Sequence, residues 1–248
     1  MASVLAPVSA LRLLSDTALA GLVIPASRLD HEPRRARLAT GLGVLDRALG
    51  GGWPAAALAE LCGRRSAGRT SVLHATLAAA IVREQTVALV DAAGAFDPCS
   101  AETAGVMLAR LLWIRAGGAR DQALIALQAA DVLIAAGGFG LVAIDFGEET
   151  PRAPTAAWLR LRHAAERQGT GVLVVARGRT AGAVAAAAVN LHDARPHFVA
   201  AGGPLLASFE TRIAVERAVG PLPAPANGND GDDRCLQFRL HHTGPSDQ

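Results

Sequence analysis

The sequence contains no lysine and no tyrosine. All 24 residues counted as Lys or Arg are arginines, set against 22 aspartates and glutamates, and the formal net charge is only +2. A charge this small does not by itself indicate a nucleic-acid-binding protein. The absence of lysine matters for any motif that requires one, because a lineage drifting from lysine to arginine can lose a catalytic lysine in the process.

Cysteine is scarce, and long apolar runs are absent. Cys62, Cys99 and Cys235 are widely spaced and form no Cys-x-x-Cys pair. We therefore expect reduced, mostly buried thiols rather than a disulfide framework or a metal site. The N-terminus lacks a basic region, and Arg12 and Asp16 interrupt its apolar residues, which argues against a signal peptide. No window approaches the roughly 18 apolar residues of a membrane span, so we expect a soluble, cytoplasmic protein.

The chain divides into three parts by composition. Hydrophobic residues make up 51% of the 248 positions, enough for one substantial core. We assign that core to residues 39–220, preceded by an N-terminal helix and charged linker (1–38). Residues 221–248 follow as a mobile Pro/Asn/Gly/Asp loop, a terminal strand and a tail.

Residues 7–22 are predicted to form an amphipathic helix. Helical periodicity places Leu11, Leu14 and Leu22 near one face, which docks either on a partner or on the protein's own core. The linker after it ends in a cluster of three arginines, which either contact a phosphate or an acidic partner or are simply solvated. They are Arg34, Arg35 and Arg37.

From residue 39 onward, short apolar runs alternate with segments of helical length. Such repeated β-α units predict a mainly parallel sheet covered by helices. The predicted strands are 57–61, 86–91, 111–115, 140–145 and 170–176, followed by 206–219 and 234–241 at the C-terminal edge. The predicted helices are 69–84, 99–110, 120–136 and 154–168.

The segment GRRSAGRT (63–70) has the spacing of a phosphate-binding loop. Gly63 and Gly68 permit tight turns, and the following helix presents free N–H groups to an anion. Thr70 stands where the motif places its magnesium-binding hydroxyl, but Arg69 stands where it places lysine. A guanidinium is larger and geometrically more demanding than an ammonium, so Arg69 can retain anion binding while spoiling the alignment for phosphoryl transfer.

In order and spacing, several segments resemble the ATPase core of the RecA family. They are ATGLGVLDRALGGGWP (39–54), the loop at 63–70, LVDAAGAFDP (89–98), LLWIRAGGARDQAL (111–124), GLVAIDF (140–146) and SFETRIAVERAV (208–219). The resemblance spans residues 38–220. It implies an α/β fold with a RecA-like core: a mainly parallel sheet flanked by helices, with antiparallel strands at the C-terminal edge.

The chain departs from the RecA pattern at the residues that carry catalysis. The glutamate that activates water is replaced by Ala93, and alanine cannot act as a base. The adenine-stacking aromatic is replaced by Cys99-Ser100, and the γ-phosphate-sensing glutamine falls near Arg177-Gly178. Asp145 remains at the position that orients magnesium, either for that role or as a polar strand end. The resemblance therefore implies a pseudo-ATPase that uses neither ATP nor magnesium as a cofactor.

The DNA-binding loops of the RecA pattern also look reduced. The first shrinks to 146–155, and the second, 178–193, is rich in alanine and has no Phe, Trp or Tyr. Single-strand binding usually combines a basic groove with stacking rings, so we expect weak or no direct DNA binding. Arg177 and Arg179 either meet a phosphate or serve as surface charge.

A shortened, degenerate core of this kind resembles the ImuA family of mutasome accessory proteins. The resemblance implies a cytoplasmic, nucleoid-associated role in the SOS response and translesion synthesis. The implied partners are RecA, an ImuB-type polymerase homologue and an error-prone replicative-type polymerase. Two alternatives stay open: a small RecA-paralogue ATPase that uses Arg69, and a DNA-binding module that uses the linker arginines.

Overall fold

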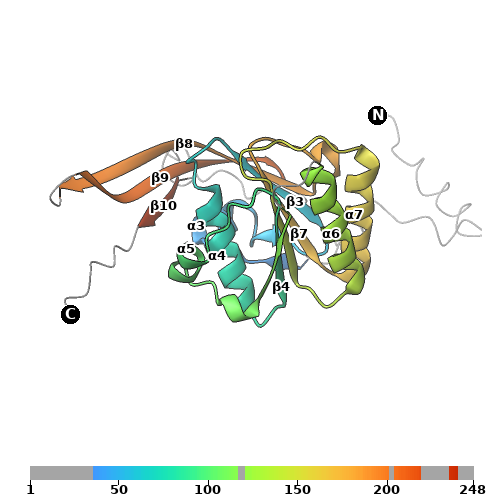
Figure 1. Cartoon of the computed structure of the whole chain (residues 1–248). Coiled ribbons are helices and arrows are strands. Elements are labelled where there is room, and N and C mark those ends of the chain that lie inside the picture. The colour runs from blue at the N-terminus through green and yellow to red at the C-terminus, as the bar shows by residue number, and fades with distance from the viewer. Residues whose placement is uncertain (1–35, 117–120, 201–203, 219–234, 240–248) are drawn as a thin grey trace, which may run out of the picture. The chain divides into compact units, whose positions relative to one another are not determined.

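The computed structural model describes residues 36–116, 121–200, 204–218 and 235–239. Its main sheet has eight strands in the order β10-β9-β8-β3-β7-β6-β4-β5 (Figure 1). The strands are β3 (Leu58–Gly63), β4 (Val87–Asp91), β5 (Leu111–Arg115), β6 (Leu141–Asp145), β7 (Gly171–Ala176), β8 (Ala187–Ala200), β9 (Pro204–Arg217) and β10 (Cys235–Arg239). All neighbours from β8 to β5 pair in parallel, whereas β8, β9 and β10 pair antiparallel. The expected α/β fold, with antiparallel strands at the C-terminal edge, is confirmed.

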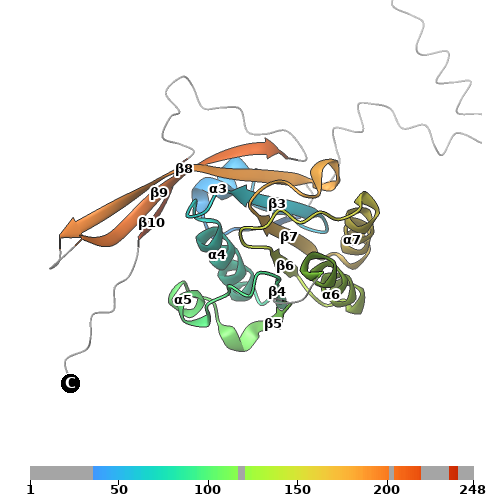
Figure 2. The same ribbon diagram turned by 45° about the horizontal axis from the view of Figure 1, so that its top comes forward.

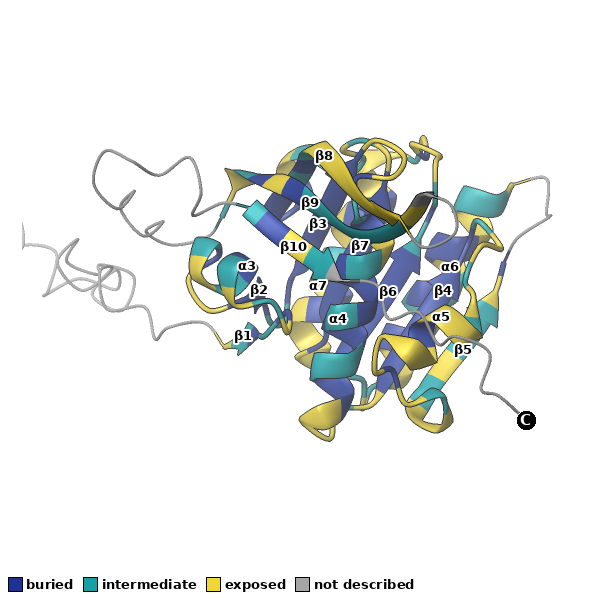
Figure 3. Ribbon diagram, turned by 90° about the vertical axis from the view of Figure 1, so that its left-hand side faces the viewer, coloured by how far each residue is buried: buried dark blue, intermediate teal, exposed yellow. Residues whose placement is uncertain are grey.

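Helices cover both faces of the sheet (Figure 2). One face carries α4 (Arg69–Val82) and α5 (Pro98–Thr103), and the other carries α6 (Gln122–Ala136) and α7 (Thr155–Gln168). Side chains of a strand alternate between faces, so a doubly covered strand must be apolar throughout. In β6, Val142 and Ile144 join the α6/α7 core, while Leu141 and Ala143 join the α4 core. Figure 3 shows the central strands buried and the helix surfaces partly exposed.

A small two-stranded sheet lies beside α4. It pairs β1 (Arg37–Leu38) with β2 (Trp53–Pro54), and α3 (Gly43–Ala48) lies between them in the chain. The Trp53 ring is buried, and its Nε1 donates a 3.3 Å hydrogen bond to Thr76 Oγ1 on α4. This bond and the buried ring attach the segment before the phosphate loop to the first core helix.

Two predicted elements are wrong. Residues 99–110 are not one helix: α5 ends at Thr103, and a 3₁₀ turn (Leu108–Arg110) follows, because Gly105 adopts a positive φ of 91° that ends helical hydrogen bonding. Residues 178–193 are not all loop, because β8 begins at Ala187. Alanines make this run look featureless, yet Ala187, Ala188 and Val189 are buried in the sheet.

The cysteines also differ from expectation. Of the three, only Cys62 is buried, while Cys99 is exposed and Cys235 is half-buried. Among the described residues no His, Cys, Asp and Glu side chains group as a metal site. None of the described helices is long and apolar enough to cross a membrane.

Several predictions fall outside the described residues. They concern the helix at 7–22 with Leu11, Leu14 and Leu22, the linker arginines Arg34 and Arg35, and the loop 221–233. Arg37 lies inside the described part, on β1, where its Nη1 donates to the carbonyl of Gly52 at 3.4 Å.

Candidate phosphate-binding site

The phosphate loop connects β3 to α4 with the predicted backbone. Gly63 is the last residue of β3, and Gly68 caps α4 with a φ of 95°, in the left-handed region. A Cβ at Gly68 would lie 2.8 Å from the Phe209 ring, so both the conformation and the space require glycine. Val72 N–H donates to the Gly68 carbonyl at 3.0 Å, which starts the helix. The first-turn amides of α4 therefore face the loop.

Arg69 is turned into the protein rather than left open in the loop. Its side chain is only 8% exposed. Nη1 donates to the carbonyl of Gly147, and Nη2 donates to the carboxylate of Glu148. Both acceptors lie in the loop after β6, so the guanidinium connects the phosphate loop to the neighbouring loop. The positive charge of the motif is thus paired within the chain.

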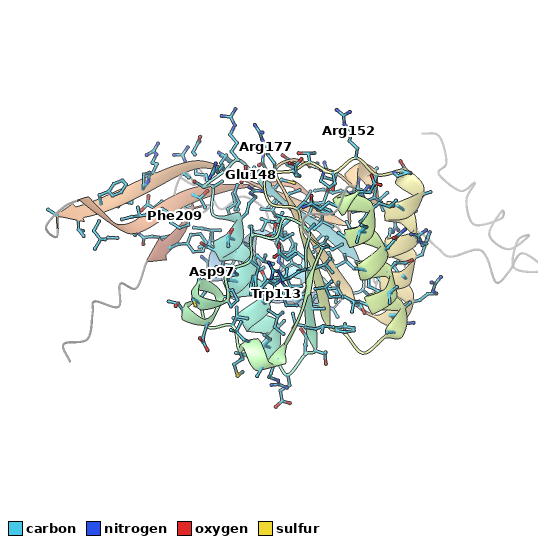
Figure 4. All side chains as sticks on the ribbon, viewed as in Figure 1. Asp97, Trp113, Glu148, Arg152, Arg177 and Phe209 are labelled. Atoms are coloured by element: carbon cyan, nitrogen blue, oxygen red, sulfur yellow. The ribbon has the colours of Figure 1, made fainter. Side chains whose placement is uncertain are left out.

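Asp145 and Thr70 line the same cleft, which has a volume of 470 Å³. Asp145 ends β6, and its Oδ1 accepts a 2.8 Å hydrogen bond from the N–H of Gly147. Burial raises the pKa of this carboxyl, and nearby Asp91 raises it further, against the opposing effects of the Gly147 N–H and Arg69. Thr70 is exposed. Figure 4 shows Glu148 and Arg177 at the same end of the sheet.

The position expected to carry a catalytic base holds only a methyl group. Ala93 lines the cleft, and its N–H donates to the carbonyl of Asp145 at 3.2 Å. A Cβ added to Gly147 would lie 2.7 Å from the Ala93 Cβ, so the two loops are in close contact there. Asp91, two residues earlier, is fully buried and accepts from the N–H groups of Ala95 and Phe96 at 3.0 and 3.2 Å. Through these two hydrogen bonds its carboxylate fixes the conformation of the loop that follows β4.

The segment expected to carry the adenine-stacking ring is a helix start without an aromatic residue. Asp97 caps α5 by accepting from Ser100 N–H at 3.0 Å, and Ser100 Oγ donates to the same carboxylate oxygen. The Ser100 hydrogen bonds lower the pKa of Asp97. Both Cys99 and Ser100 are exposed. These residues organise the local turn.

Three residues that the sequence analysis did not single out also line the cleft: His74, Phe96 and Gln122. His74 is buried, packs edge-on against Phe96 with ring centroids 5.7 Å apart, and has a pKa lowered by burial. Gln122 donates from Nε2 to the carbonyl of Ala92. Helical spacing was the available signal for His74, since it lies four residues after Thr70 on α4 and hence on the same face.

A second cleft, of 340 Å³, lies between the phosphate loop and the β8–β9 hairpin. Its polar side includes Ser66 and Thr70, and its apolar side includes Pro196 and Phe209. The Phe209 ring stacks on Phe238 of β10, with centroids 4.9 Å apart. The sequence analysis missed this apolar wall because it depends on how the strands β8, β9 and β10 pair and on their position beside the phosphate loop.

The loop after β7, expected in the RecA pattern to face DNA, is tied to β3. The buried carboxylate of Glu60 accepts from Thr180 N–H at 2.6 Å and Ala181 N–H at 2.7 Å. Arg179 donates to Glu60 at 3.2 Å and lies 3.8 Å from Glu216. Arg179 is therefore engaged in ion pairs within the chain, although both Arg179 and Arg177 are exposed.

Comparison with known proteins places these features in a family. A model of the RecA N-terminal domain matches residues 27–157. Protein RecA of Lactobacillus delbrueckii subsp. bulgaricus is 36% identical over 103 residues, which cover 41% of this chain and 30% of that protein. Protein RecA of Borreliella afzelii is 35% identical over 109 residues, covering 44% and 29%. Protein RecA of Limosilactobacillus reuteri is 38% identical over 114 residues, covering 44% and 30%. The aligned part is thus about three tenths of each relative.

Proposed function

The chain belongs to the RecA N-terminal domain family, whose model matches more than half of it, and we propose that it is a catalytically inactive accessory member. In this proposal it acts by protein–protein contacts, in the manner of the ImuA family, during the SOS response and translesion synthesis. Its partners are RecA, an ImuB-type polymerase homologue and an error-prone replicative-type polymerase. Direct DNA binding is weak or absent.

The single observation that carries the proposal is the engagement of Arg69. An incoming phosphate has to compete for this guanidinium with Glu148 and with the carbonyl of Gly147. Both acceptors belong to the same chain, so their effective concentration at Arg69 is high. The cation that would bind the β- and γ-phosphates is therefore already neutralised.

The surroundings of Ala93 support the absence of hydrolysis. Water attack on a phosphoryl group needs a group that orients and deprotonates the water. Ala93 supplies none, and Asp91 accepts two backbone hydrogen bonds in its own loop. The acidic residues that line the cleft are Asp145, Glu148 and Glu149, of which Glu148 is paired with Arg69.

A magnesium nucleotide fits these residues incompletely. Thr70 and Asp145 line one cleft and have the chemistry of magnesium ligands. Asp145 Oδ1 already accepts from the N–H of Gly147, and Arg69 is turned toward Glu148. We assign no catalytic step to a nucleotide here.

Nucleotide titration of the full chain with magnesium tests the proposed inactivity. We expect no micromolar binding of ATP and no release of phosphate, in calorimetry and in a steady-state assay. The second candidate, a small RecA-paralogue ATPase, is favoured only by the shared cleft of Thr70 and Asp145. Micromolar affinity together with turnover that Asp145→Ala abolishes would establish that candidate instead.

The partner contacts need a separate test, because an inactive phosphate loop is compatible with many roles. Affinity capture from DNA-damaged source cells is expected to recover RecA and mutagenic polymerase subunits. Deleting residues 1–25 tests whether the predicted helix with Leu11, Leu14 and Leu22 makes the RecA contact. Recovery of neither partner would contradict the accessory role. Strongly salt-dependent binding of single-stranded DNA would favour the DNA-binding module.

A further inference from the structure

Three arginines and one glutamate line a hollow of 500 Å³ beside the phosphate loop: Arg64, Arg65, Arg177 and Glu148. We call it the arginine hollow. All four residues are exposed. Within the part of the chain that the structure describes, no hydrogen bond or ion pair engages the side chain of any of the three arginines, whereas Glu148 is bonded to Arg69. The hollow therefore holds positive charge that the described residues do not neutralise.

Backbone hydrogen bonds hold the walls of the arginine hollow together. The N–H of Gly63 donates to the carbonyl of Arg177 at 3.3 Å, and the N–H of Arg177 donates to the carbonyl of Glu149 at 3.1 Å. The phosphate loop, the loop after β7 and the loop after β6 are thus joined directly beside the three arginines. Since this backbone is already fixed, binding of a ligand has to order only side chains.

The two loops that follow β6 and β7 carry further charges of both signs. Exposed Glu149 follows Glu148 in the chain, and the exposed side chain of Arg152 points outward at the same end of the sheet (Figure 4). Arg179 lies two residues after Arg177, but its guanidinium is paired with the buried Glu60. Along these loops, the unpaired cations nearest each other are therefore those of the arginine hollow.

The neighbouring strand β8 does not extend the arginine hollow. Ala194 and Pro196 line the cleft that β8 shares with the phosphate loop, so Arg195 between them belongs to the opposite face of the strand. Asp193 lies 3.9 Å from the Arg212 guanidinium and contributes a negative charge. Among the described residues, the excess of cations is a compact cluster rather than a stripe.

We propose that the arginine hollow binds a short acidic segment of a protein partner, whose carboxylates pair with Arg64, Arg65 and Arg177. A guanidinium matches the geometry of a carboxylate with two parallel hydrogen bonds, and such charge-assisted bonds are about twice as strong as neutral ones. The phosphate loop already contains one example, because Arg69 is bonded to the Glu148 carboxylate. The proposed function names partners but no surface, and this inference stands on the charges of the hollow alone.

Two features favour an acidic peptide over nucleic acid. None of the four lining residues is aromatic, whereas single-stranded nucleic acid is usually bound on stacking rings. A nucleic-acid backbone is charged at every nucleotide and needs cations along its path, but the adjoining segments also present Glu149 and Asp193. A peptide with two or three carboxylates needs only a compact cluster of cations, which is what the hollow provides.

A small anion fits the arginine hollow less well than a peptide does. Only four residues line it, and all four are exposed. Sites for small molecules enclose most of the surface of their ligand. A peptide can instead place its carboxylates in an open hollow while the rest of its chain stays outside.

Fluorescence anisotropy of a labelled peptide of alternating glutamate and serine, titrated with the full chain, tests the proposal. We expect saturable binding that Arg64→Gln, Arg65→Gln and Arg177→Gln each weaken about fivefold, as for the stronger exposed ion pairs. Arg152→Gln is the matched control, because it removes the same charge at the same end of the sheet but outside the hollow. No binding to the wild type would overturn the proposal, and so would equal weakening by Arg152→Gln.

Three further probes separate an acidic peptide from other ligands. A peptide of alternating glutamine and serine should not bind, and oligothymidylate and tripolyphosphate should each bind more weakly than the glutamate peptide. Binding of the glutamine peptide would show that charge is not recognised. Binding of oligothymidylate at least as tight as that of the glutamate peptide would assign the hollow to nucleic acid, and the same result with tripolyphosphate would assign it to a small anion. Each of these results would contradict the proposal.

Arginine side-chain NMR of the isotope-labelled wild type separates direct contact from altered folding. The Nε–Hε signals of Arg64, Arg65 and Arg177, identified by their loss in the three glutamine variants, should shift when the glutamate peptide is added. The signal of Arg152 should stay in place. If the three signals do not move while the peptide binds, its site lies elsewhere on the chain and the proposed surface is wrong.

Discussion

Two loops beside β3, the phosphate loop and the loop after β7, are each held by an arginine–glutamate pair, and the two pairs are buried in opposite ways. At the phosphate loop, the Arg69 side chain is 8% exposed and Glu148 is 47% exposed. After β7, the Glu60 side chain is 1% exposed and Arg179 is 34% exposed. The charge that is buried needs the larger set of partners, because removal from water has to be offset by hydrogen bonds.

The partners of the two buried groups differ in kind. Glu60 accepts from two backbone amides, from Thr180 Oγ1 and from Arg179, so it organises a loop even without the arginine. Arg69 donates to one carbonyl and one carboxylate, and the carboxylate occupies the place of an anionic ligand. One pair is therefore structural, and the other takes up a potential binding site.

Among substitutions in these two pairs, removal of Glu60 is expected to lower the stability of the protein most. Glu60→Ala leaves the amides of Thr180 and Ala181 without their acceptor and should lower the free energy of unfolding by about 3–5 kcal/mol. Arg179→Gln should cost only about 1 kcal/mol, because the amides keep Glu60 paired. Urea denaturation measures both. Equal losses would show that the ion pair, rather than the amides, holds the loop.

Neutralising Glu148 should have a smaller effect on stability but a distinct effect on binding. Glu148→Gln retains an acceptor for Arg69 and should lower the free energy of unfolding by about 1 kcal/mol. Because the neutral amide competes less strongly than the Glu148 carboxylate, Arg69 should bind inorganic phosphate about tenfold more tightly than in the wild type. This is a difference of about 1.4 kcal/mol. Calorimetric titration with phosphate measures this gain.

Glu149→Gln is the matched control for that experiment. It removes the same charge one residue further along the exposed loop, where Glu149 lines the cleft without a hydrogen bond to Arg69. We expect no comparable gain in phosphate affinity. A gain of the same size in both variants would indicate a general effect of net charge and would remove Glu148 as a specific competitor.

The smallest expected effect concerns the pH dependence of stability at Asp145. Burial raises the pKa of this carboxyl in the folded protein, so the folded state keeps its proton to a higher pH than the unfolded chain, whose value is about 3.9. The contribution of Asp145 to stability should therefore fall as the pH rises from that value through the folded pKa. Asp145→Asn keeps an acceptor for the N–H of Gly147. Because asparagine has no carboxyl group to ionise, this variant should not lose stability over the same pH range.

Thermal unfolding of both proteins across acidic and neutral pH measures the difference. Asp145→Asn should be more stable than the wild type at pH 7, and its advantage should disappear toward the unfolded pKa. A difference that stays constant with pH would mean that the Asp145 charge is not responsible.

The order of strands and helices was largely predictable from the sequence. The apolar runs 86–91, 140–145 and 170–176 each became one strand, because a strand buried on both faces must be apolar throughout. The run 111–115 also became one strand, β5, which lies at the edge of the sheet and is only partly buried. Two errors arose where that signal fails. The helix predicted at 99–110 breaks at Gly105, and the alanines of 187–188 carry too little pattern to indicate a strand.

The candidate site was predictable only as far as its backbone. Gly63, Gly68 and Thr70 were recognised from their spacing, as was Asp145 at a strand end. The contribution of His74 and Phe96 to the cleft was not, because their contact depends on the packing of α4 against the loop after β4. Nor did the segment 178–193 reveal that Glu60 binds it from 120 residues away.

The sequence by itself determined the turn at GRRSAGRT, because glycine spacing and the start of a helix are local effects of sterics and backbone hydrogen bonding. It also determined that Arg69 stands in place of lysine and Ala93 in place of a base. Only the tertiary structure decided what Arg69 does. Its partner Glu148 is 79 residues away, and Phe209 reaches Gly68 through the pairing of β8 with β9. Such contacts follow from how strands and loops pack, which no local pattern specifies.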